Sequence, residues 1–348
     1  MRDVAGFFCP LHKFDLNFTK STMKNANKVS RSFQHMILLC GCLLIYYSVS
    51  ARQHKPTESG YIAQKTQGID SDYVLIFNSY SESAPWCRSL VDSTVMDLIK
   101  LSPQTMTVTQ NLNSGLLRDE KALAQLRQQV DVSYHDKPRM IIYIGSTSWP
   151  FLHETIEKKW GKVPSIIFSD IDYTGPIANL LRKTPIAPAL RIPYDKIVKE
   201  YEGALSVVYM PIYLRQSLAL MHQLTPPMTE LCFISDTRWI SAQMRADMAA
   251  ITKTDFPELK VRYLISADMS TLDLLDSLQH YGQETGVLFF SWLKQSQVGD
   301  SFVNDSHFRT IISKSARQPL FVLNDNEVNT DSDVLGGYFP TRAAGSHH

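Results

Sequence analysis

The sequence has no excess of either charge. Its 35 Lys and Arg residues almost balance its 34 Asp and Glu residues. A chain without a positive excess lacks the basic field that attracts nucleic acid. No low-complexity tract or short repeat stands out, and the hydrophobic fraction of 44% is ordinary for a globular protein. We therefore expect a globular protein with no nucleic-acid partner.

Motifs of the common enzyme and cofactor classes are also missing. His153 and Glu154 are not followed by the second His of a zinc hydrolase, and no Cys-x-x-Cys occurs. The sequence contains no G-x-S-x-G, no G-x-x-x-x-G-K and no G-x-G-x-x-G. The acidic stretch 329–333 alternates oxygen ligands, but Val334 stands where a calcium loop needs Gly. We therefore expect no metal and no cofactor, and we interpret the chain as a non-enzyme.

Cysteine is scarce, with 5 residues in the chain. Cys9, Cys40 and Cys42 lie close to the N-terminus, whereas Cys87 and Cys232 fall in different halves of the remaining sequence. A bridge between the last two would lock those halves together. Because buried thiols behave as small hydrophobic groups, we expect both to be free.

The N-terminal region resembles an export signal. An uncharged, apolar run over 36–49 follows several basic residues, and it is shorter than the roughly 18 residues expected of a membrane-spanning helix. Small residues at the end of the run allow cleavage after Ser50. Retention as an anchor is the alternative, because Tyr46 and Tyr47 resemble interfacial anchors and Arg52 follows them.

From residue 73 onward, short apolar runs alternate with longer amphipathic ones. Continuous apolar strands separated by helices indicate a parallel sheet that is covered on both faces. We expect strands over 73–77, 105–109, 140–144 and 165–168, and helices over 85–101, 119–130 and 149–160.

The alternation of strands and helices stops over 174–193, where four prolines break regular structure, and then resumes. Two α/β units of similar design imply a cleft between two lobes, and open α/β sheets bind ligands outside the carboxyl ends of their strands. In the second unit we expect strands over 205–209, 231–235, 260–265, 287–290, 320–323 and 334–338, and helices over 213–224, 239–252, 271–281 and 305–316.

The segment 78–86 (NSYSESAPW), directly after the first expected strand, carries a family resemblance. It resembles an Asn-Ser-Tyr-x-Glu-x-x-Pro-Trp motif that opens the sensor domains of bacterial membrane histidine kinases and of related ABC-transporter substrate-binding proteins. The abundance of Tyr, Met and Gln near the expected crossover into the second lobe suggests the Bacteroidetes branch of these sensors. Further pieces that resemble the family are 144–148, 166–170, 209–218, 231–236 and 334–338.

The resemblance implies a type 1 periplasmic-binding fold with two lobes, each a doubly wound parallel sheet. In the family, a membrane span and a kinase follow the last strand, so we expect the kinase part outside this chain. The expected division is a signal peptide or anchor (1–51), a linker (52–72), an N-terminal lobe (73–205), a C-terminal lobe (206–340) and a tail (341–348).

The resemblance further implies an extracytoplasmic sensing domain that binds a small molecule in the cleft between its lobes. Such a domain would lie in the periplasm, either free or held at the inner membrane by its N-terminal segment. The formation of a homodimer is left as an open alternative. A free periplasmic solute-binding protein of an ABC transporter is one alternative. An α/β enzyme with an active site in its cleft is another.

Two aromatic residues and two hydroxyl residues are the first candidates for ligand binding. Tyr80 and Trp86 lie where polar loop residues would suffice, so they either line the cleft or pack at the edge of a lobe. Ser83 is the expected N-cap of the helix over 85–101. Ser146 and Thr147 either donate to the ligand or cap the helix that follows them.

The remaining candidates also follow expected strands. Asp170 accepts hydrogen bonds from a ligand or lies in a solvated loop, and Asp236 is a ligand group, a helix cap or both. A Trp beside a Lys, as at Trp292, suits a planar or anionic ligand group. The full candidate set is Tyr80, Trp86, Ser146, Thr147, Asp170, Tyr213, Asp236, Trp292, Asn324 and Asp325.

Overall fold

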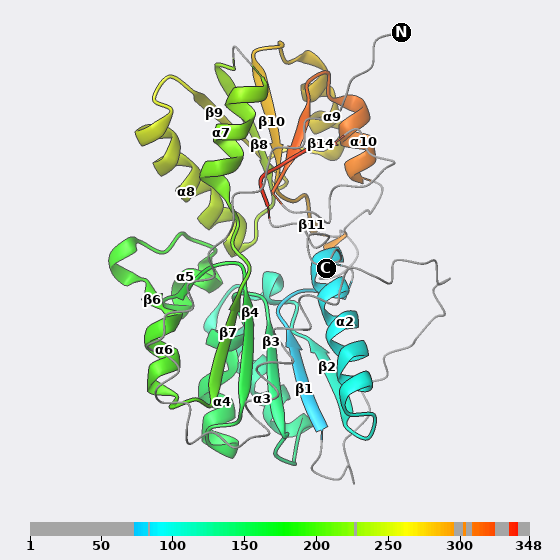
Figure 1. Cartoon of the computed structure of the whole chain (residues 1–348), viewed down its shortest axis with the longest axis vertical. Helices are drawn as coiled ribbons and strands as arrows, with labels where there is room; N and C mark the ends of the chain where they lie inside the picture. The colour runs from blue at the N-terminus through cyan, green and yellow to red at the C-terminus, as the bar shows by residue number, and fades with distance from the viewer. Residues whose placement is uncertain are drawn as a thin grey trace, which may run out of the picture. The chain divides into compact units, whose positions relative to one another are not determined.

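The computed structural model describes residues 73–82, 84–225, 228–295, 302–303, 308–323 and 334–339. All of them belong to one unit of the chain, Tyr46–His348. The leader, the linker and the tail that the sequence predicts at 1–51, 52–72 and 341–348 lie outside the described residues. Two five-stranded sheets with their helices form the described part (Figure 1).

The first sheet has the strand order β2-β1-β3-β4-β7, and every neighbouring pair is parallel. Its strands are β1 (Tyr73–Asn78), β2 (Met106–Asn111), β3 (Met140–Ile144), β4 (Ser165–Ser169) and β7 (Leu205–Tyr209). This is the order of a doubly wound sheet, in which the chain starts in the middle and winds outward in both directions.

The second sheet repeats this order. Read from its β9 edge, it runs β9-β8-β10-β13-β14, again with parallel neighbours. Its strands are β8 (Glu230–Ser235), β9 (Lys260–Ile265), β10 (Thr285–Phe289), β13 (Leu320–Val322) and β14 (Val334–Gly336). The predicted architecture, two lobes that each contain a doubly wound parallel sheet, is confirmed.

Helices connect the strands in both lobes. The helices of the first lobe are α2 (Pro85–Leu101), α3 (Glu120–Ser133), α4 (Ser148–Trp160), α5 (Ile177–Arg182) and α6 (Tyr194–Glu200), with a short 3-10 helix at Ser114–Leu116. Those of the second lobe are α7 (Leu214–Leu224), α8 (Trp239–Asp255), α9 (Thr271–His280) and α10 (Phe308–Ser315). Helices α3 and α4 pack together, as do α7 with α8 and α9 with α10.

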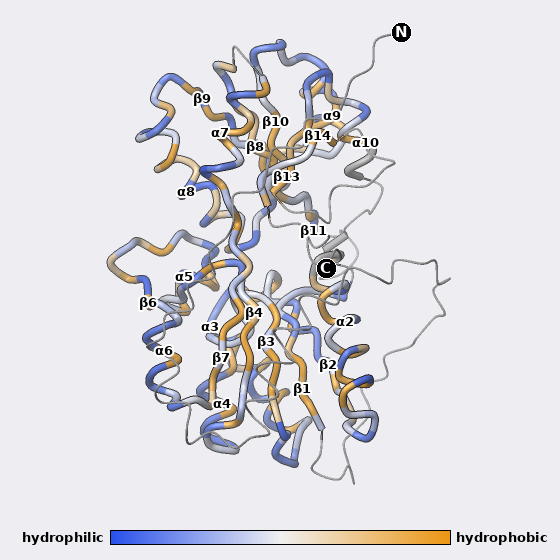
Figure 2. The backbone as a smooth tube through the Cα atoms, viewed as in Figure 1, coloured by the Kyte–Doolittle hydropathy of each residue, from blue (hydrophilic) through white to orange (hydrophobic). Residues whose placement is uncertain are grey.

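The central strands of each sheet are buried because both faces of the sheet are covered. All of β1 is buried, and β1, β3 and β4 are mostly hydrophobic in Figure 2. In β8, Leu231 and Phe233 join the core that includes α7 and α8, whereas Cys232 and Ile234 join a second core with α9 and α10. Successive side chains of a strand point to opposite faces, so an unbroken apolar run is what a doubly covered strand requires.

The Pro-rich stretch departs from the prediction. It contains α5 and the small antiparallel pair β5 (Tyr173–Thr174) and β6 (Ile192–Pro193), and α6 follows directly. Pro176 and Pro193 occupy the N-cap positions of α5 and α6. Proline is well tolerated at a helix start, where the missing N–H has no partner within the helix. These prolines therefore begin helices instead of preventing them.

The strand over 205–209 also lies in a different place from the one expected. We expected it to open the second unit, but β7 pairs with β4 at the edge of the first sheet. The first sheet therefore extends beyond the boundary predicted at residue 205, and the chain passes to the second lobe after Tyr209.

Two smaller predictions concern cysteines and membrane spans. Cys87 and Cys232 are both free and buried, as expected. Within the described segments, no helix combines the length and the apolar character that crossing a membrane requires.

Candidate functional site

Each sheet has one place where its strand order reverses. In the first sheet β1 lies between β2 and β3, and in the second β8 lies between β9 and β10. Ligands of open α/β sheets bind outside the carboxyl ends of the strands at such switch points. The loops after β1 and β3, and those after β8 and β10, are therefore the places to examine.

The loops of the first lobe pack closely around Gly145. This residue has φ +89°, and a Cβ atom there would lie 2.8 Å from both Ser79 Oγ and Tyr80 Cε2. Glycine is therefore required for the approach of the two loops. Ser79 Oγ in turn accepts the backbone N–H of Ser148 at 2.9 Å, at the start of α4.

This contact corrects the predicted capping of α4. Thr147 occupies the N-cap position, but its side chain does not cap the helix. Its hydroxyl is instead hydrogen-bonded to Ser114 at 2.8 Å. The hydroxyl of Ser146 has no hydrogen-bond partner. At α2 the N-cap residue is Ala84, which has no capping side chain, and Ser83 lies outside the described residues.

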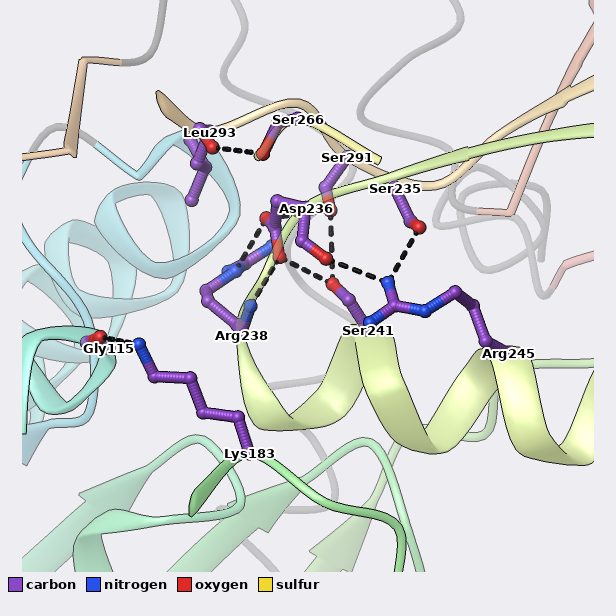
Figure 3. A network of polar contacts seen from close by, with 10 residues as sticks. All are labelled: Gly115, Lys183, Ser235, Asp236, Arg238, Ser241, Arg245, Ser266, Ser291 and Leu293. Carbon is purple, nitrogen blue, oxygen red and sulfur yellow. Dashed lines mark hydrogen bonds and ion pairs between the residues drawn. The ribbon is translucent and has the colours of Figure 1, made fainter. Parts of the chain in front are cut away.

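A network of polar contacts in the second lobe surrounds Asp236 (Figure 3), and this residue is fully buried. Its Oδ1 accepts the backbone N–H of Arg238 at 2.9 Å and the Ser241 hydroxyl at 2.5 Å. Its Oδ2 accepts Arg238 Nε and the Ser291 hydroxyl, both at 2.8 Å. Arg245 donates to Ser235 Oγ and to the Asp236 carbonyl. Every polar atom of the Asp236 carboxylate is therefore paired.

Asp236 holds Arg238 against the other lobe. The Arg238 guanidinium lies over the Tyr80 ring, 4.9 Å from its centroid. Burial lowers the pKa of Arg238, but the charge of Asp236, the charge of Tyr80 and the hydrogen bond to Asp236 together with Cys87 raise it above its ordinary value. The cation therefore stays charged where it meets the aromatic ring, which is a favourable cation–π arrangement.

A small cavity lies between the two lobes at this point. It is lined from the first lobe by Tyr80, Ser114, Gly115, Thr147, Leu180 and Lys183, and from the second by Arg238, Trp239 and Ile240. Its volume is about 10 Å³, which is room for roughly one water molecule. A larger solute can occupy this place only when the lobes separate.

Lys183 lines the cavity with no carboxylate in ion-pair contact among the described residues. Its ammonium group donates to the Gly115 carbonyl, as Figure 3 shows. Burial, followed by the charge of Arg118, lowers the pKa of Lys183 below its ordinary value. Lys183 therefore supplies a partly desolvated positive charge at the cavity wall.

The carboxyl edge of the first sheet holds what we call the unpaired cluster, in which buried oxygen atoms have no hydrogen-bond partner among the described residues. Its atoms are Ser146 Oγ, Asp170 Oδ1, Tyr173 Oη, Thr174 Oγ1 and Tyr194 Oη. Buried polar groups in native proteins are nearly always paired, so several unpaired ones in one place require an explanation.

The carboxylate of Asp170 is the charged member of this cluster. Burial raises the pKa of Asp170 above its ordinary value of 3.8, and the backbone at Asp170, followed by the charge of Arg238, partly offsets this effect. After burial, the charge of Asp170 contributes to the raised pKa of Tyr80, and it also contributes at Tyr173 and Tyr194. These tyrosines therefore lie near enough to the carboxylate for its charge to affect their pKa values.

Helix α8 also binds the Pro-rich segment of the first lobe. Gln243 Oε1 accepts the backbone N–H of Ile186 at 2.8 Å, and Trp239 Nε1 donates to the Thr184 carbonyl at 3.1 Å. Arg191 donates to Asp247 at 3.0 Å. The N-terminal half of α8 therefore carries both the cavity wall and the polar contacts to the other lobe.

The structure brings together half of the candidate residues. Tyr80 and Thr147 line the cavity, Asp236 positions Arg238 there, and Ser146 and Asp170 belong to the unpaired cluster. Residues of the second lobe fill the acceptor positions of Asp236, so this carboxylate stabilises its own lobe. The side chain of Trp86, as well as Asn324 and Asp325, lies outside the described residues.

Tyr213 and Trp292 lie elsewhere. Tyr213 precedes α7 and packs edge to face against Tyr338, with 5.4 Å between ring centroids. Trp292 is buried in the core on the α9 side, and its Nε1 donates to Thr271 Oγ1 at 3.2 Å. Neither residue lines the cavity.

Several residues of the site were not predicted. Lys183, Thr174 and Tyr194 come from the Pro-rich stretch and its end, where we expected no regular structure. Arg238 was noticeable only as a charged neighbour of Asp236 in the loop after a strand. No pattern in the sequence distinguished Lys183 from the other lysines.

The described residues contain no group of three or more His, Cys, Asp or Glu side chains arranged to hold a metal ion. The polar side chains that line the cavity carry hydroxyl, ammonium, guanidinium and indole N–H groups. This set suits recognition of a small polar molecule by hydrogen bonds and charge.

No protein-family model matches the chain, and no curated protein matches it. Among solved structures it is similar to an ABC domain from Streptococcus pneumonia in complex with L-Trp, at 13% identity over 74% of this chain and 76% of that one, with a TM-score of 0.43. A solute-binding protein of an ABC transporter from Burkholderia multivorans is similar at 11% identity over 79% and 89% of the chains, with a TM-score of 0.43.

An ABC sugar transporter subunit from Rhodobacter sphaeroides is a third similar structure. It shows 11% identity over 77% of this chain and 85% of that one, with a TM-score of 0.43. The function proposed below rests on the geometry of the site itself.

Proposed function

We propose that this chain is an extracytoplasmic sensing domain that binds a small solute between its two lobes. One observation carries the proposal. The cavity lies at the switch points of both doubly wound sheets, and residues of both lobes line it. Sheets of this kind bind ligands at that place.

Binding would act through the separation of the lobes. With the lobes together, the cavity of about 10 Å³ is too small for a solute, and Arg238 lies over Tyr80. A solute enters when the lobes separate and shifts the equilibrium only through its different affinities for the open and closed forms. Such a change can be passed to a kinase, which makes the sensor of a membrane histidine kinase the role we favour.

A free periplasmic solute-binding protein of an ABC transporter is the alternative within the same class. Both roles use the same cleft, so binding alone does not separate them. The reading frame of the gene does: a sensor predicts a membrane span and a kinase in the same polypeptide, whereas a transport protein predicts neither.

A screen of small solutes by thermal unfolding of the full chain tests the proposal. A ligand that binds only the folded state adds RT ln(1 + [L]/Kd), which is about 2.7 kcal/mol at 100 times Kd. We expect at least one solute class to raise the unfolding midpoint with increasing concentration. No shift across sugars, amines, amino acids and carboxylates would contradict the proposal.

A matched pair of lysine variants locates the binding. Lys183 lines the cavity and donates to the Gly115 carbonyl, whereas Lys162 donates to the Glu200 carbonyl in an exposed position. We expect Lys183→Met to change the affinity for the solute and Lys162→Met to leave it as in the wild type. Recovery of the solute unchanged after incubation, measured by mass spectrometry, separates binding from the enzyme alternative.

A further inference from the structure

The carboxyl edge of the first sheet combines a charge and several hydroxyl groups that have no partner. Tyr80, Ser146 and Asp170 follow β1, β3 and β4, which are neighbours in the sheet. Parallel strands place such residues side by side at one edge. Ser146 is 1% exposed, and Asp170 Oδ1 is shielded from solvent although the residue as a whole is half-buried.

Two of the nearby cations are already paired with other carboxylates. Arg238 is paired with Asp236 at 2.8 Å, and Arg191 is paired with Asp247 at 3.0 Å. A third nearby cation, Lys183, donates to the Gly115 carbonyl. Asp170 is therefore a carboxylate without an ion pair among the described residues, and a buried charge without a partner is costly.

The aromatic rings at this edge attract cations. Arg238 lies 4.9 Å from the centroid of the Tyr80 ring, and Arg191 lies 4.4 Å from that of Tyr173. The face of an aromatic ring favours a positive charge through its quadrupole. Guanidinium groups already lie over both rings, so the Asp170 carboxylate is the group left to attract a small cation with N–H groups.

We infer that the solute carries a protonated amine, which donates to Asp170 Oδ1 and to neighbouring hydroxyl oxygens of the unpaired cluster. This inference rests on the proposed function, because it specifies the ligand of the same cleft. An ammonium group has three donors, and the cluster offers acceptors on Ser146, Thr174 and Tyr194 as well as on Asp170. A charge-assisted hydrogen bond to the carboxylate supplies most of the discrimination.

Matched amines and alcohols test the inference on the wild-type full chain. The probes are benzylamine with benzyl alcohol, cyclohexylamine with cyclohexanol, and 1,4-diaminobutane with 1,4-butanediol, each at millimolar concentration near neutral pH. We expect at least one amine to raise the unfolding midpoint while its alcohol partner does not. Equal shifts from both partners, or no shift from any amine, would overturn the inference.

Two variants link the effect to Asp170. Asp170→Asn should weaken amine binding by roughly tenfold or more, because a hydrogen bond to a charged group is lost. Asp172→Asn, an exposed change in the same loop, should keep the wild-type affinity. Amine binding that is the same in Asp170→Asn and the wild type would refute the assignment.

A second readout needs no bound solute. Removing an unpaired buried charge should raise the unfolding midpoint of Asp170→Asn above that of the wild type. A lower midpoint would show that the carboxylate has a structural partner, and the inference would fall. The proposed function has its own test: sugars or carboxylates that bind while amines do not would sustain it without this inference.

Discussion

The two lobes share one strand order but differ in how the polar groups at their carboxyl edges are satisfied. In the second lobe, Asp236 accepts four hydrogen bonds, from Arg238, Ser241 and Ser291. In the first lobe, Asp170 Oδ1 and Ser146 Oγ are buried without partners. A satisfied network specifies one rigid arrangement, whereas an unsatisfied one is stable only at a cost. This difference supports the proposal that the second lobe contributes a fixed network and that the first lobe contributes the groups that bind the solute.

The largest expected effect comes from breaking the satisfied network. Asp236→Ala leaves the Arg238 guanidinium without its carboxylate and removes the acceptor of Ser241 and Ser291. Removing one partner of a buried ion pair costs about 3–5 kcal/mol of unfolding free energy. Urea unfolding measures this loss, with the exposed Asp276→Ala as a control that should change it by less than about 0.5 kcal/mol. A loss for Asp236→Ala as small as that of the control would contradict the comparison.

The contact between the lobes gives the next effect. Gln243→Leu removes the acceptor of the Ile186 backbone N–H, which is then buried without a partner. The expected cost is about 1–3 kcal/mol in the same unfolding measurement. If the segment around Ile186 is instead free of α8 in solution, the variant will unfold like the wild type.

Two fully buried serines allow a direct comparison of the carboxyl edges of the two sheets. Ser241 is 0% exposed and donates to Asp236 at 2.5 Å, whereas Ser146 is 1% exposed and has no partner. Ser241→Ala should cost about 1–3 kcal/mol, because it leaves a charged acceptor with one bond fewer. Ser146→Ala should change the unfolding free energy by less than about 0.5 kcal/mol. Equal losses in the two variants would show that the first edge is satisfied after all.

The smallest effect is a dependence on pH at Asp170. Its pKa in the folded protein is raised above the ordinary value of 3.8. Between the pKa of the unfolded state and that of the folded state, the folded protein therefore binds more protons than the unfolded chain. The wild type therefore loses stability as pH rises from about the unfolded value through the folded one. The stability advantage of Asp170→Asn over the wild type should be smallest at acid pH and grow towards neutral pH.

The groups that face Asp170 do not mask this dependence. Arg238 keeps its charge, and burial raises the pKa of each tyrosine that faces the carboxylate. Urea midpoints of Asp170→Asn and wild type at several pH values measure the effect, and Asp172→Asn corrects for the change in net charge. An advantage that shrinks as pH rises would contradict the assigned direction.

The sequence predicted the fold well, because hydrophobic periodicity is a local property. The predicted helix over 85–101 has the bounds of α2, and the predicted strands over 140–144 and 260–265 have those of β3 and β9. The prolines at 176 and 193 were misinterpreted, because proline breaks a helix interior but begins a helix at its first positions. Whether α5 and α6 form depends on packing that no local pattern contains.

The candidate site was only partly predictable. The rule that ligands bind at strand ends identified Tyr80, Ser146, Thr147 and Asp170, because the end of a strand can be located in the sequence. The same rule selected Trp292, whose indole N–H is satisfied by Thr271 on another element. Which of several strand-end residues point to the cavity depends on tertiary contacts, as does the position of Lys183.

Hydrogen exchange of the full chain with and without the solute that most raises its unfolding midpoint tests the central claim most directly. If the solute binds between the lobes, exchange should slow in the loops after β1, β3, β4 and β8, at residues 78–80, 144–148, 169–174 and 236–241. Protection restricted to other segments, with these loops exchanging as in the free protein, would contradict the account.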